Sequence, residues 1–335
     1  MSVVFVTGGA GYVGSHAVKG LAAAGYDVVV YDDLSAGHRE AIERIAHASP
    51  GRSVTLVEGD MLDGPKVARA MATARPDAVM HFAARLDVGE SVREPLAYYH
   101  VNVTGTLSVL AAMAANNVSR FVFSSTCAIF GETDVPLHED LPKQPVNAYG
   151  ETKLAIERAL PHVERATGIR WTALRYFNAA GADGDGVIGE AHDPEIHLIP
   201  RAIAAAARGT DFTVFGDDYP TPDGTCIRDY VHVSDLADAH VRALHRPEAG
   251  GESGAYNLGT GTGMSVRQVL DAIERTAGRA VPHRLSGRRP GDPARLVAKS
   301  DRAGNELGWR ATRSLDDIVD TAWRWHERHP LGYSS

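Results

Sequence analysis

A tyrosine and a lysine stand four positions apart in the segment NAYGETK, residues 147–153. Pro145 precedes the pair and an Ala/Glu/Arg-rich run follows it, so Tyr149 and Lys153 share one face of a predicted helix. A free tyrosine has a pKa near ~10 and is a weak base at neutral pH. A neighbouring ammonium favours the phenolate and predicts a lowered pKa. The same spacing also fits an ordinary pair on a solvated helix, so other features of the chain must show whether the two residues belong to an active site.

Glycines spaced G-x-x-G-x-x-G follow the first apolar run of the chain, in VVFVTGGAGYVGSH. The apolar run predicts a strand and the Ala-rich run after the glycines predicts a helix, which is the context of a dinucleotide fingerprint. Glycines here permit a tight turn and a close approach of the backbone to a pyrophosphate, which would face the free N–H groups of the helix N-terminus. Gly8, Gly11 and Gly14 are therefore predicted to bind a dinucleotide.

Acidic residues follow the second and third apolar runs. Asp32 comes directly after VVVY, where a carboxylate can hydrogen-bond an adenosine ribose and would repel a 2′-phosphate, so NAD is predicted over NADP. The alternative is a helix cap, because Asp32 and Asp33 precede a turn and Asp caps helices well. Asp60, in VEGDM, could reach the adenine at the sheet edge or cap the next helix, and the spacing favours neither.

Hydroxyl residues end the apolar run FVFSST. Ligands of open α/β sheets bind beyond the carboxyl edge of the strands, so Ser124, Ser125 and Thr126 are expected beside the cofactor. With Tyr149 and Lys153 they form a proton-transfer set for alcohol–ketone interconversion, in which the tyrosine takes a hydroxyl proton while hydride leaves for the nicotinamide. The oxidised nicotinamide would favour the phenolate further, and Lys153 would also hold the ribose. Thr126 would hydrogen-bond the same substrate oxygen or, alternatively, local backbone.

Short apolar runs alternate with Ala-rich helical stretches through the first half of the chain. Each run is nearly all apolar and rich in Val and Phe, as expected for a strand buried on both faces. Repeated β-α-β-α predicts a parallel sheet with helices on both faces. Strands are expected at 3–6, 28–31, 54–57, 78–82, 121–125 and 171–177, and helices at 13–24, 64–74, 95–116 and 149–167.

The second half has shorter elements between Gly- and Pro-rich loops. The predicted fold class is α/β, with a Rossmann-type doubly wound parallel sheet and a smaller C-terminal α/β substrate domain. The division is expected between residues 1–177 and 178–335, with later segments returning to the first part. Helices are expected near 198–208, 234–246, 265–277 and 314–328.

Composition excludes several classes of protein. The formal net charge of −8 argues against nucleic acid or an anionic membrane as the main partner. The two cysteines, Cys127 and Cys226, form no C-x-x-C motif, no apolar run approaches membrane length, and the N-terminus resembles no leader, so a cytoplasmic protein is expected. No metal is expected, because the histidines show no H-E-x-x-H or paired ligand spacing. These histidines are His81, His138, His192, His197, His232 and His240.

A set of motifs in fixed order closely resembles the UDP-glucose 4-epimerase family of the extended short-chain dehydrogenase/reductase superfamily. The resemblance runs from about residue 3 to Tyr333. The glycine triplet and Y-x-x-x-K belong to the superfamily broadly, whereas the long FGDD block, VGES and RYFN are more specific to the epimerases. The motifs are TGGAGYVGSH, HFAA, VGESV, SST, IFGE, Y-x-x-x-K, LRYFNAAGA, FGDDYPTPDGTCIRDYVHVSDLADAH, YNLGTG and RRPGD.

The resemblance implies an NAD-binding domain over 1–177 and a mainly UDP-sugar-binding domain over 178–335. It assigns Tyr149 as the base, Lys153 as its partner and Thr126 as the Ser/Thr of the set. The implied NAD contacts are Gly8, Gly11, Tyr12, Val13, Gly14, Asp32, Asp33, Asp60, Met61, Phe82, Ala83, Ala84, Asn102, Tyr149, Lys153 and Phe177. The implied UDP-sugar contacts are Thr126, Tyr149, Asn178, Leu198, Thr213, Phe215, Arg228, Arg289 and Asp292.

The chain departs from the family pattern at two informative places. After HFAA, where many relatives carry a lysine that contacts the cofactor, Arg85 is the only cation, and whether it reaches NAD stays open. Leu296 is near where some relatives carry a tyrosine that blocks N-acetylated sugars, so UDP-GalNAc could fit. Two arginines beside Gly-rich loops, Arg228 and Arg289, suit a diphosphate because guanidinium groups bind phosphate oxygens in pairs, although surface solvation is the alternative.

The expected function is interconversion of UDP-galactose and UDP-glucose through transient NAD-dependent oxidation at C4, with a 4-keto sugar that turns over before reduction. Epimerisation of another UDP-sugar, N-acetylated or pentose, is the main alternative. A nucleotide-sugar 4,6-dehydratase is disfavoured because Cys127 and Ala128, rather than an Asp-Glu pair, follow Thr126. A non-catalytic NAD-sensing module is disfavoured by the intact Tyr–Lys pair. The resemblance also implies a homodimer, for which the helices at 95–116 and 149–167 could supply the contact.

Overall fold

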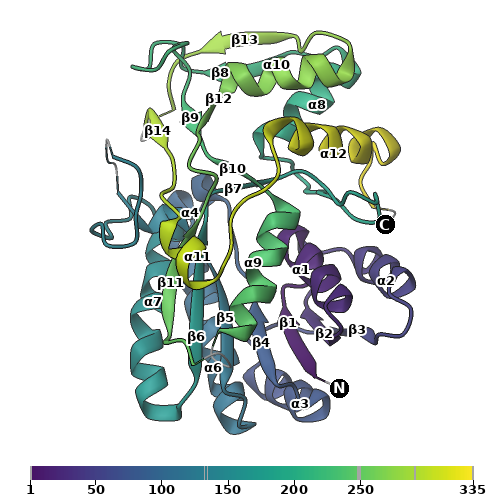
Figure 1. The fold of residues 1–335 in the computed structure, drawn as a ribbon, viewed down its shortest axis with the longest axis vertical. Coiled ribbons are helices and arrows are strands. Elements are labelled where there is room, and N and C mark those ends of the chain that lie inside the picture. The colour runs from purple at the N-terminus through teal and green to yellow at the C-terminus, as the bar shows by residue number, and fades with distance from the viewer. Residues whose placement is uncertain (1, 132, 134, 247–249, 290–291, 334–335) are drawn as a thin grey trace.

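A seven-stranded parallel sheet forms the centre of the computed structural model, which describes residues 2–131, 133, 135–246, 250–289 and 292–333. Its strand order is β11-β6-β5-β4-β1-β2-β3, so the chain starts in the middle and winds outward in both directions. The predicted Rossmann-type fold class is confirmed (Figure 1). The strands are β1 (Val3–Thr7), β2 (Asp27–Asp32), β3 (Val54–Glu58), β4 (Ala78–His81), β5 (Arg120–Thr126), β6 (Arg170–Tyr176) and β11 (Gly254–Leu258).

Helices cover both faces of the sheet because successive strand residues point to opposite sides. In β1, Val4 and Val6 pack into one buried cluster with Leu21 and Ile45. Phe5, between them, packs into the other cluster. The first face is covered by α1 (Tyr12–Ala23), α2 (Arg39–Ala48) and α9 (Val233–His245), and the second by α3 (Gly64–Ala74), α6 (Gly105–Ala115) and α7 (Ala148–Thr167).

The single helix expected at 95–116 is interrupted in its hydrogen bonding. It consists of α5 (Pro95–Tyr98), a π-helical turn over Tyr99–Thr104 and α6. The wide turn contains Asn102, whose side chain is buried and bonded to other elements, and π-turns of this kind are frequent at functional sites. Sequence periodicity also missed α2 and two six-residue helices, α4 (Val88–Arg93) and α11 (Asp301–Glu306).

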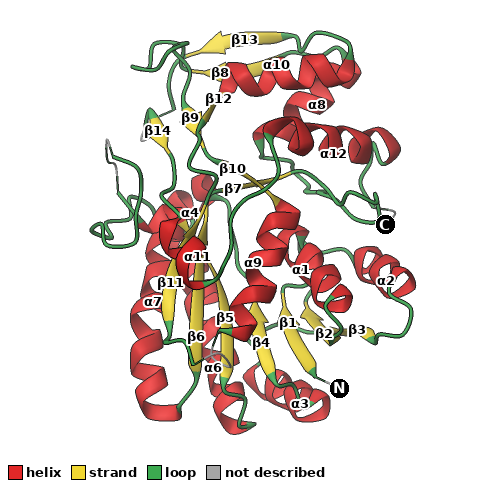
Figure 2. Ribbon diagram, in the orientation of Figure 1, coloured by secondary structure: helices red, strands yellow, loops and turns green. Residues whose placement is uncertain are grey.

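A second layer of short strands and helices stands above the carboxyl edge of the sheet (Figure 2). Its helices pack around a separate apolar cluster that includes Ile203, Val269 and Val319. The helices are α8 (Leu198–Arg208), α10 (Val266–Ala277) and α12 (Leu315–Arg328). The strands are β7 (Asn178–Ala180), β8 (Phe212–Phe215), β9 (Ile227–Arg228), β10 (Tyr230–His232), β12 (Met264–Ser265), β13 (His283–Ser286) and β14 (Arg295–Leu296).

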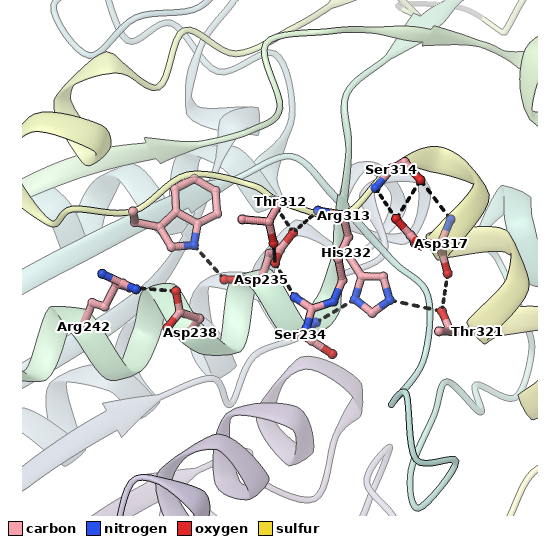
Figure 3. A network of polar contacts seen from close by, with 11 residues as sticks. His232, Ser234, Asp235, Asp238, Arg242, Thr312, Arg313, Ser314, Asp317 and Thr321 are labelled. Atoms are coloured by element: carbon pink, nitrogen blue, oxygen red, sulfur yellow. Dashed lines mark hydrogen bonds and ion pairs between the residues drawn. The ribbon is translucent and has the colours of Figure 1, made fainter.

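A buried carboxylate joins α9 to the segment that leads into α12 (Figure 3). Asp235 accepts hydrogen bonds from the backbone N–H groups of Thr312 and Arg313, at 2.9 and 3.0 Å. His232 contacts Thr321 of α12 at 3.1 Å.

Two elements from the second half of the chain, α9 and β11, pack with the first half. The position of the domain boundary, expected at residue 177, therefore stays a prediction. Within the described ranges, no helix has the length and apolarity required to cross a membrane.

Candidate active site

The loop between β1 and α1 contains Gly8, Gly11 and Gly14 and has no room for side chains at Gly8 and Gly14. We call this loop the glycine cradle. Gly8 has φ +71°, and a Cβ built on it would lie 2.3 Å from the backbone nitrogen of Ala83. A Cβ on Gly14 would lie 2.2 Å from the carbonyl oxygen of Gly8. Gly11 is the N-cap of α1 and no side chain caps the helix, so first-turn N–H groups are available to an anion. Tyr12 and Val13 open the helix. The loop therefore fits a dinucleotide pyrophosphate.

Asp32 is fixed at the end of β2 and does not cap a helix. Its carboxylate accepts hydrogen bonds from the backbone nitrogens of Ala10 and Leu34, both at 2.9 Å. Burial raises its pKa, and these two bonds act in the opposite direction. The N-cap of α2 is His38, so the alternative of a helix cap is wrong for Asp32. Asp33 beside it accepts from Ser35 in an exposed turn.

Asp60 also belongs to a turn. Its carboxylate accepts from the backbone nitrogen of Leu62 at 2.8 Å, whereas Asp63 caps α3. The capping alternative for Asp60 is therefore wrong, and the adenine contact remains a proposal. Met61 packs closely against Gly105, where an added Cβ would lie 2.7 Å from the Met61 Cγ.

The loop after β4 is held by Asn102 from the π-helical turn. The Asn102 amide accepts from the Arg85 backbone nitrogen at 2.8 Å and donates to the Arg85 carbonyl and the Thr152 hydroxyl, both at 3.1 Å. These bonds use the amide within the protein, so we propose a positioning role for Asn102. The Arg85 guanidinium pairs with Glu90 at 2.6 Å. The backbone nitrogens of Phe82 and Ala83 donate to the Thr7 carbonyl beside the glycine cradle, and Ala84 connects them to Arg85.

The structure brings the three predicted catalytic residues together at the carboxyl edge of the sheet. Thr126 ends β5, and Tyr149 lies in the first turn of α7, whose N-cap Asn147 accepts from the Gly150 nitrogen at 2.8 Å. Gly150 lets this turn press against the chain after Thr126, since a Cβ there would lie 2.2 Å from the Ala128 carbonyl. The Lys153 ammonium is buried, donates to the Ser124 carbonyl at 2.9 Å and lies 6.0 Å from the Tyr149 ring centre.

The predicted lowering of the Tyr149 pKa depends on the charges of Lys153 and an oxidised nicotinamide, and burial acts against it. Burial raises this pKa well above the usual value, Tyr176 adds to the rise, and a hydrogen bond with Thr126 opposes it. Burial lowers the pKa of Lys153 to about 7, with Glu157 acting against the shift. The physical reason is that the fold removes both groups from water, which disfavours both charged forms. The spacing of the two residues in the sequence does not predict this desolvation.

A buried ion pair that the sequence analysis missed lies one helical turn beyond the lysine. Glu157 of α7 accepts from Arg175 of β6 at 2.5 Å, and both side chains are less than a tenth exposed. Ser125 donates to the same carboxylate at 2.5 Å. The i, i+4 spacing from Lys153 was the only local signal, because the arginine comes from a different strand. The pair connects α7 to β5 and β6 behind the proposed reacting groups.

We expect Glu157→Gln to lower the free energy of unfolding by about 3–5 kcal/mol, because it leaves the Arg175 charge buried without its carboxylate. Glu164→Gln is the matched control on the same helix: its pair with Arg170 is at 3.1 Å but partly exposed, and the expected loss is under about 1 kcal/mol. Denaturant unfolding of both variants measures the difference. Equal losses would contradict a structural role for the buried pair.

The predicted UDP-sugar residues fall in the upper layer and at the edge of the sheet. Arg228 pairs with Asp292, and the Arg289 guanidinium lies 4.1 Å from the ring centre of Phe215. Arg228 is also opposite Leu296 in the β9–β14 pairing. Pro290 and Gly291 of the RRPGD motif lie outside the described residues. Phe177 is buried beside the chain after Thr126, Asn178 starts β7, Leu198 starts α8, and Thr213 of β8 accepts from Arg284 at 3.2 Å.

This arrangement defines a short-chain dehydrogenase/reductase type of fold with its proton-transfer residues at the carboxyl edge of the sheet. The sequence pattern of the NAD dependent epimerase/dehydratase family matches residues 4–259, and the chain belongs to this family. The chain is 50% identical over 331 residues to the UDP-glucose 4-epimerase of Rhizobium meliloti, covering 98% of each protein.

Solved structures of UDP-glucose 4-epimerases are also similar to this chain. The UDP-glucose 4-epimerase from Brucella ovis in complex with NAD has a TM-score of 0.92 and 47% identity, covering 97% of this chain and 98% of that one. The UDP-glucose 4-epimerase from Stenotrophomonas maltophila, solved with NAD and formylated UDP-arabinopyranose, has a TM-score of 0.94 and 40% identity, covering 98% and 99%.

Proposed function

We propose that the protein interconverts UDP-galactose and UDP-glucose by transient oxidation at C4, with NAD retained between turnovers. The observation that carries the proposal is that Thr126, Tyr149 and Lys153 meet at the same sheet edge as the glycine cradle. The chain also shares half of its residues with a UDP-glucose 4-epimerase over nearly its whole length. A proton-transfer set beside a dinucleotide site suits reversible oxidation of a hydroxyl group.

In the proposed reaction, Tyr149 takes the proton of the C4 hydroxyl while Thr126 holds the same oxygen. Bound NAD would accept the C4 hydride and return it, so no net oxidation follows. Lys153 holds the cofactor ribose, and its charged form would favour the phenolate of Tyr149 against the burial that raises the Tyr149 pKa. After the 4-keto sugar turns over in the pocket, the hydride would return to the other face of C4, and Tyr149 gives the proton back to the C4 oxygen. The arrangement makes one residue the base for the first half and the acid for the second.

We propose that the cofactor is held by the cradle and by the loops at the ends of β2, β3 and β4. Gly8, Gly11 and Gly14 accommodate the pyrophosphate, and Asp32 faces the adenosine ribose. The remaining proposed contacts are Tyr12, Val13, Asp33, Asp60, Met61, Phe82, Ala83, Ala84 and Phe177. On the substrate, Arg228, Arg289 and Asp292 are proposed for the diphosphate and ribose, and Asn178, Leu198, Thr213 and Phe215 for the rest of the UDP-sugar.

Dehydration is the less favourable alternative for chemical reasons. Elimination of water requires an acid and a base, which the related dehydratases carry as an Asp-Glu pair directly after the threonine, and this chain has Cys127 and Ala128 there. Burial raises the pKa of the Cys127 thiol to about 12, so it is a poor proton carrier at neutral pH. Another UDP-sugar is the stronger alternative, because one similar epimerase was solved with a UDP-arabinopyranose derivative.

The decisive test is to incubate the purified protein with UDP-galactose without added NAD and to identify the product. We expect UDP-glucose, and its absence would overturn the proposal. Parallel incubations with UDP-GlcNAc and UDP-xylose determine the substrate range. If either turned over faster than UDP-galactose, it would be the main substrate instead.

We propose a cytoplasmic location, because the free Cys127 and Cys226 fit the reducing conditions there.

We propose a homodimer formed through the face of α4, α5 and α6. Large apolar side chains are exposed there, including Leu96, which is 85% exposed, and Val92, which is 65% exposed, and apolar patches of this kind mark interaction surfaces. A second copy is the proposed occupant because the resemblance implies a dimer, for which the helices at 95–116 and 149–167 could supply the contact, and α5 and α6 belong to the first of these. The other exposed members are Leu86, Val88, Tyr99 and Leu107.

Light scattering is expected to give twice the chain mass of 35.8 kDa, and Leu96→Asp is expected to shift the mass toward one chain. Leu331→Asp is the control, because Leu331 is also highly exposed, at 92%, but lies near the C-terminus. A single-chain mass for the unmodified protein would contradict the dimer.

A further inference from the structure

Two Glu-x-His pairs stand in the loop between β7 and α8, outside the residues assigned above to NAD or the UDP-sugar. The sequence is Glu-x-His-x-x-Glu-x-His over residues 190–197, and the spacing analysis predicted no metal site here. The loop is fixed at both ends: the Trp325 indole donates to the Glu190 carbonyl at 2.8 Å, and His197 is the N-cap residue of α8. The His192 ring also contacts the Tyr12 ring edge-on, with centres 6.1 Å apart.

The side chains of this loop converge on one point. One ligand atom from each of Glu190, His192, Glu195 and His197 lies within 4.8 Å of the others. The His192 Nδ1 is 3.2 Å from a Glu190 oxygen and 3.7 Å from a Glu195 oxygen, and the His197 Nδ1 is 3.3 Å from the other Glu195 oxygen. Zinc ligands about 2.0–2.1 Å from the metal in a tetrahedron are separated by about 3.4 Å. The two separations of the His192 nitrogen, 3.2 Å from Glu190 and 3.7 Å from Glu195, are close to this value.

The closest pair of atoms is nearer than two ligands of one tetrahedral zinc ion, so metal binding requires these two side chains to move apart. The His197 Nδ1 lies 2.6 Å from a Glu190 oxygen, but the atom is buried and makes no aligned hydrogen bond. Glu190 is only 4% exposed at its side chain. Within the described part of the chain, its ion-pair partners are the two histidines, which balance its charge when they are protonated, and no lysine or arginine pairs with it. A divalent cation would neutralise both carboxylates at once while the imidazoles remain neutral ligands.

We propose that Glu190, His192, Glu195 and His197 bind one divalent transition-metal ion of the Zn²⁺ class. Imidazole nitrogens favour Zn²⁺ and its neighbours over Mg²⁺ and Ca²⁺, which take oxygen ligands. One Glu195 oxygen also accepts from the His197 backbone nitrogen at 2.8 Å, which leaves the second oxygen for the metal. The ion would fix the loop onto the start of α8 and beside Tyr12. This inference depends on the geometry of the loop and is independent of the epimerase reaction.

The test uses the full-length protein after chelator treatment and removal of the chelator. Zn²⁺ is titrated in competition with a chromophoric chelator, and bound metal is measured by elemental analysis. We expect one equivalent per chain and a higher melting temperature with metal, because binding to the folded state stabilises it. His192→Gln should weaken binding by at least about 100-fold, whereas His47→Gln, which changes an exposed histidine of α2, should bind as the unmodified protein does.

Cobalt provides a readout that requires no variant. Co²⁺ added to the unmodified protein should give the intense visible absorption of a four-coordinate site, and Zn²⁺ should displace it. The inference is overturned by a stoichiometry far below one, by unchanged affinity in a folded His192→Gln protein, or by a cobalt spectrum like that of the hydrated ion. If His192→Gln does not fold, the cobalt spectrum and the stoichiometry of the unmodified protein decide.

Discussion

Replacing Tyr149 with phenylalanine is expected to lower turnover of UDP-galactose by about 10²- to 10⁴-fold, the usual contribution of a positioned acid–base group. The change removes only the hydroxyl, so the ring still fills its place at the start of α7. Thr126 and Lys153 remain, but the threonine hydroxyl is a very weak base and the lysine nitrogen is bonded to the Ser124 carbonyl, so neither replaces Tyr149. The effect should fall on kcat, with bound NAD retained.

The control for this variant is Tyr256→Phe, which removes another tyrosine hydroxyl. Tyr256 lies in β11 and donates to Glu306 at 2.8 Å, far along the chain from the proposed reacting groups. We expect Tyr256→Phe to retain its turnover, even if it unfolds at a lower temperature. Turnover in Tyr149→Phe within tenfold of the unmodified enzyme would remove Tyr149 from its proposed role.

Gly14→Ala is expected to weaken NAD binding by roughly 10- to 100-fold, which corresponds to the strain of about 1–3 kcal/mol typical of overpacking. The added methyl would lie 2.2 Å from the Gly8 carbonyl oxygen and 2.9 Å from the Gly9 Cα. Both are backbone atoms, so the turn must open to relieve the contact, and an opened turn no longer follows a pyrophosphate. The measurements are NAD content after purification and the dissociation constant of added NAD.

Gly20→Ala on the same helix separates this effect from a general effect of glycine replacement. A Cβ on Gly20 would meet the Val241 side chain at 3.6 Å, an ordinary contact. Alanine in a helix interior is favoured over glycine by about 0.5–1 kcal/mol, so the control should keep its NAD and unfold at an equal or higher temperature. If both variants bound NAD equally well, the close approach at Gly14 would not determine the cofactor site.

The features that sequence predicted well are those that depend on neighbouring residues. α3 and α8 begin and end at the predicted residues, because caps, Pro positions and the following glycines are local signals. The six-residue α4 was missed, since few apolar positions repeat within so short a helix, and α2 was missed although Ile42 and Ile45 are buried at helical spacing. Asp32 and Asp60 were left between two roles, and only the positions of His38 and Asp63 show that neither one caps a helix.

The amino-acid sequence by itself determined the glycine cradle, the Tyr149–Lys153 spacing and the alternation of strands and helices along the first half of the chain, because each depends on residues close together in the chain. The tertiary structure decided which distant groups meet: Glu157 with Arg175, and Asn102 with Arg85 and Thr152. It also decided the direction of the pKa shifts, since desolvation depends on everything packed around a group. The same holds for the Glu–His loop before α8, whose side chains converge through an irregular backbone that neither helical nor strand periodicity describes.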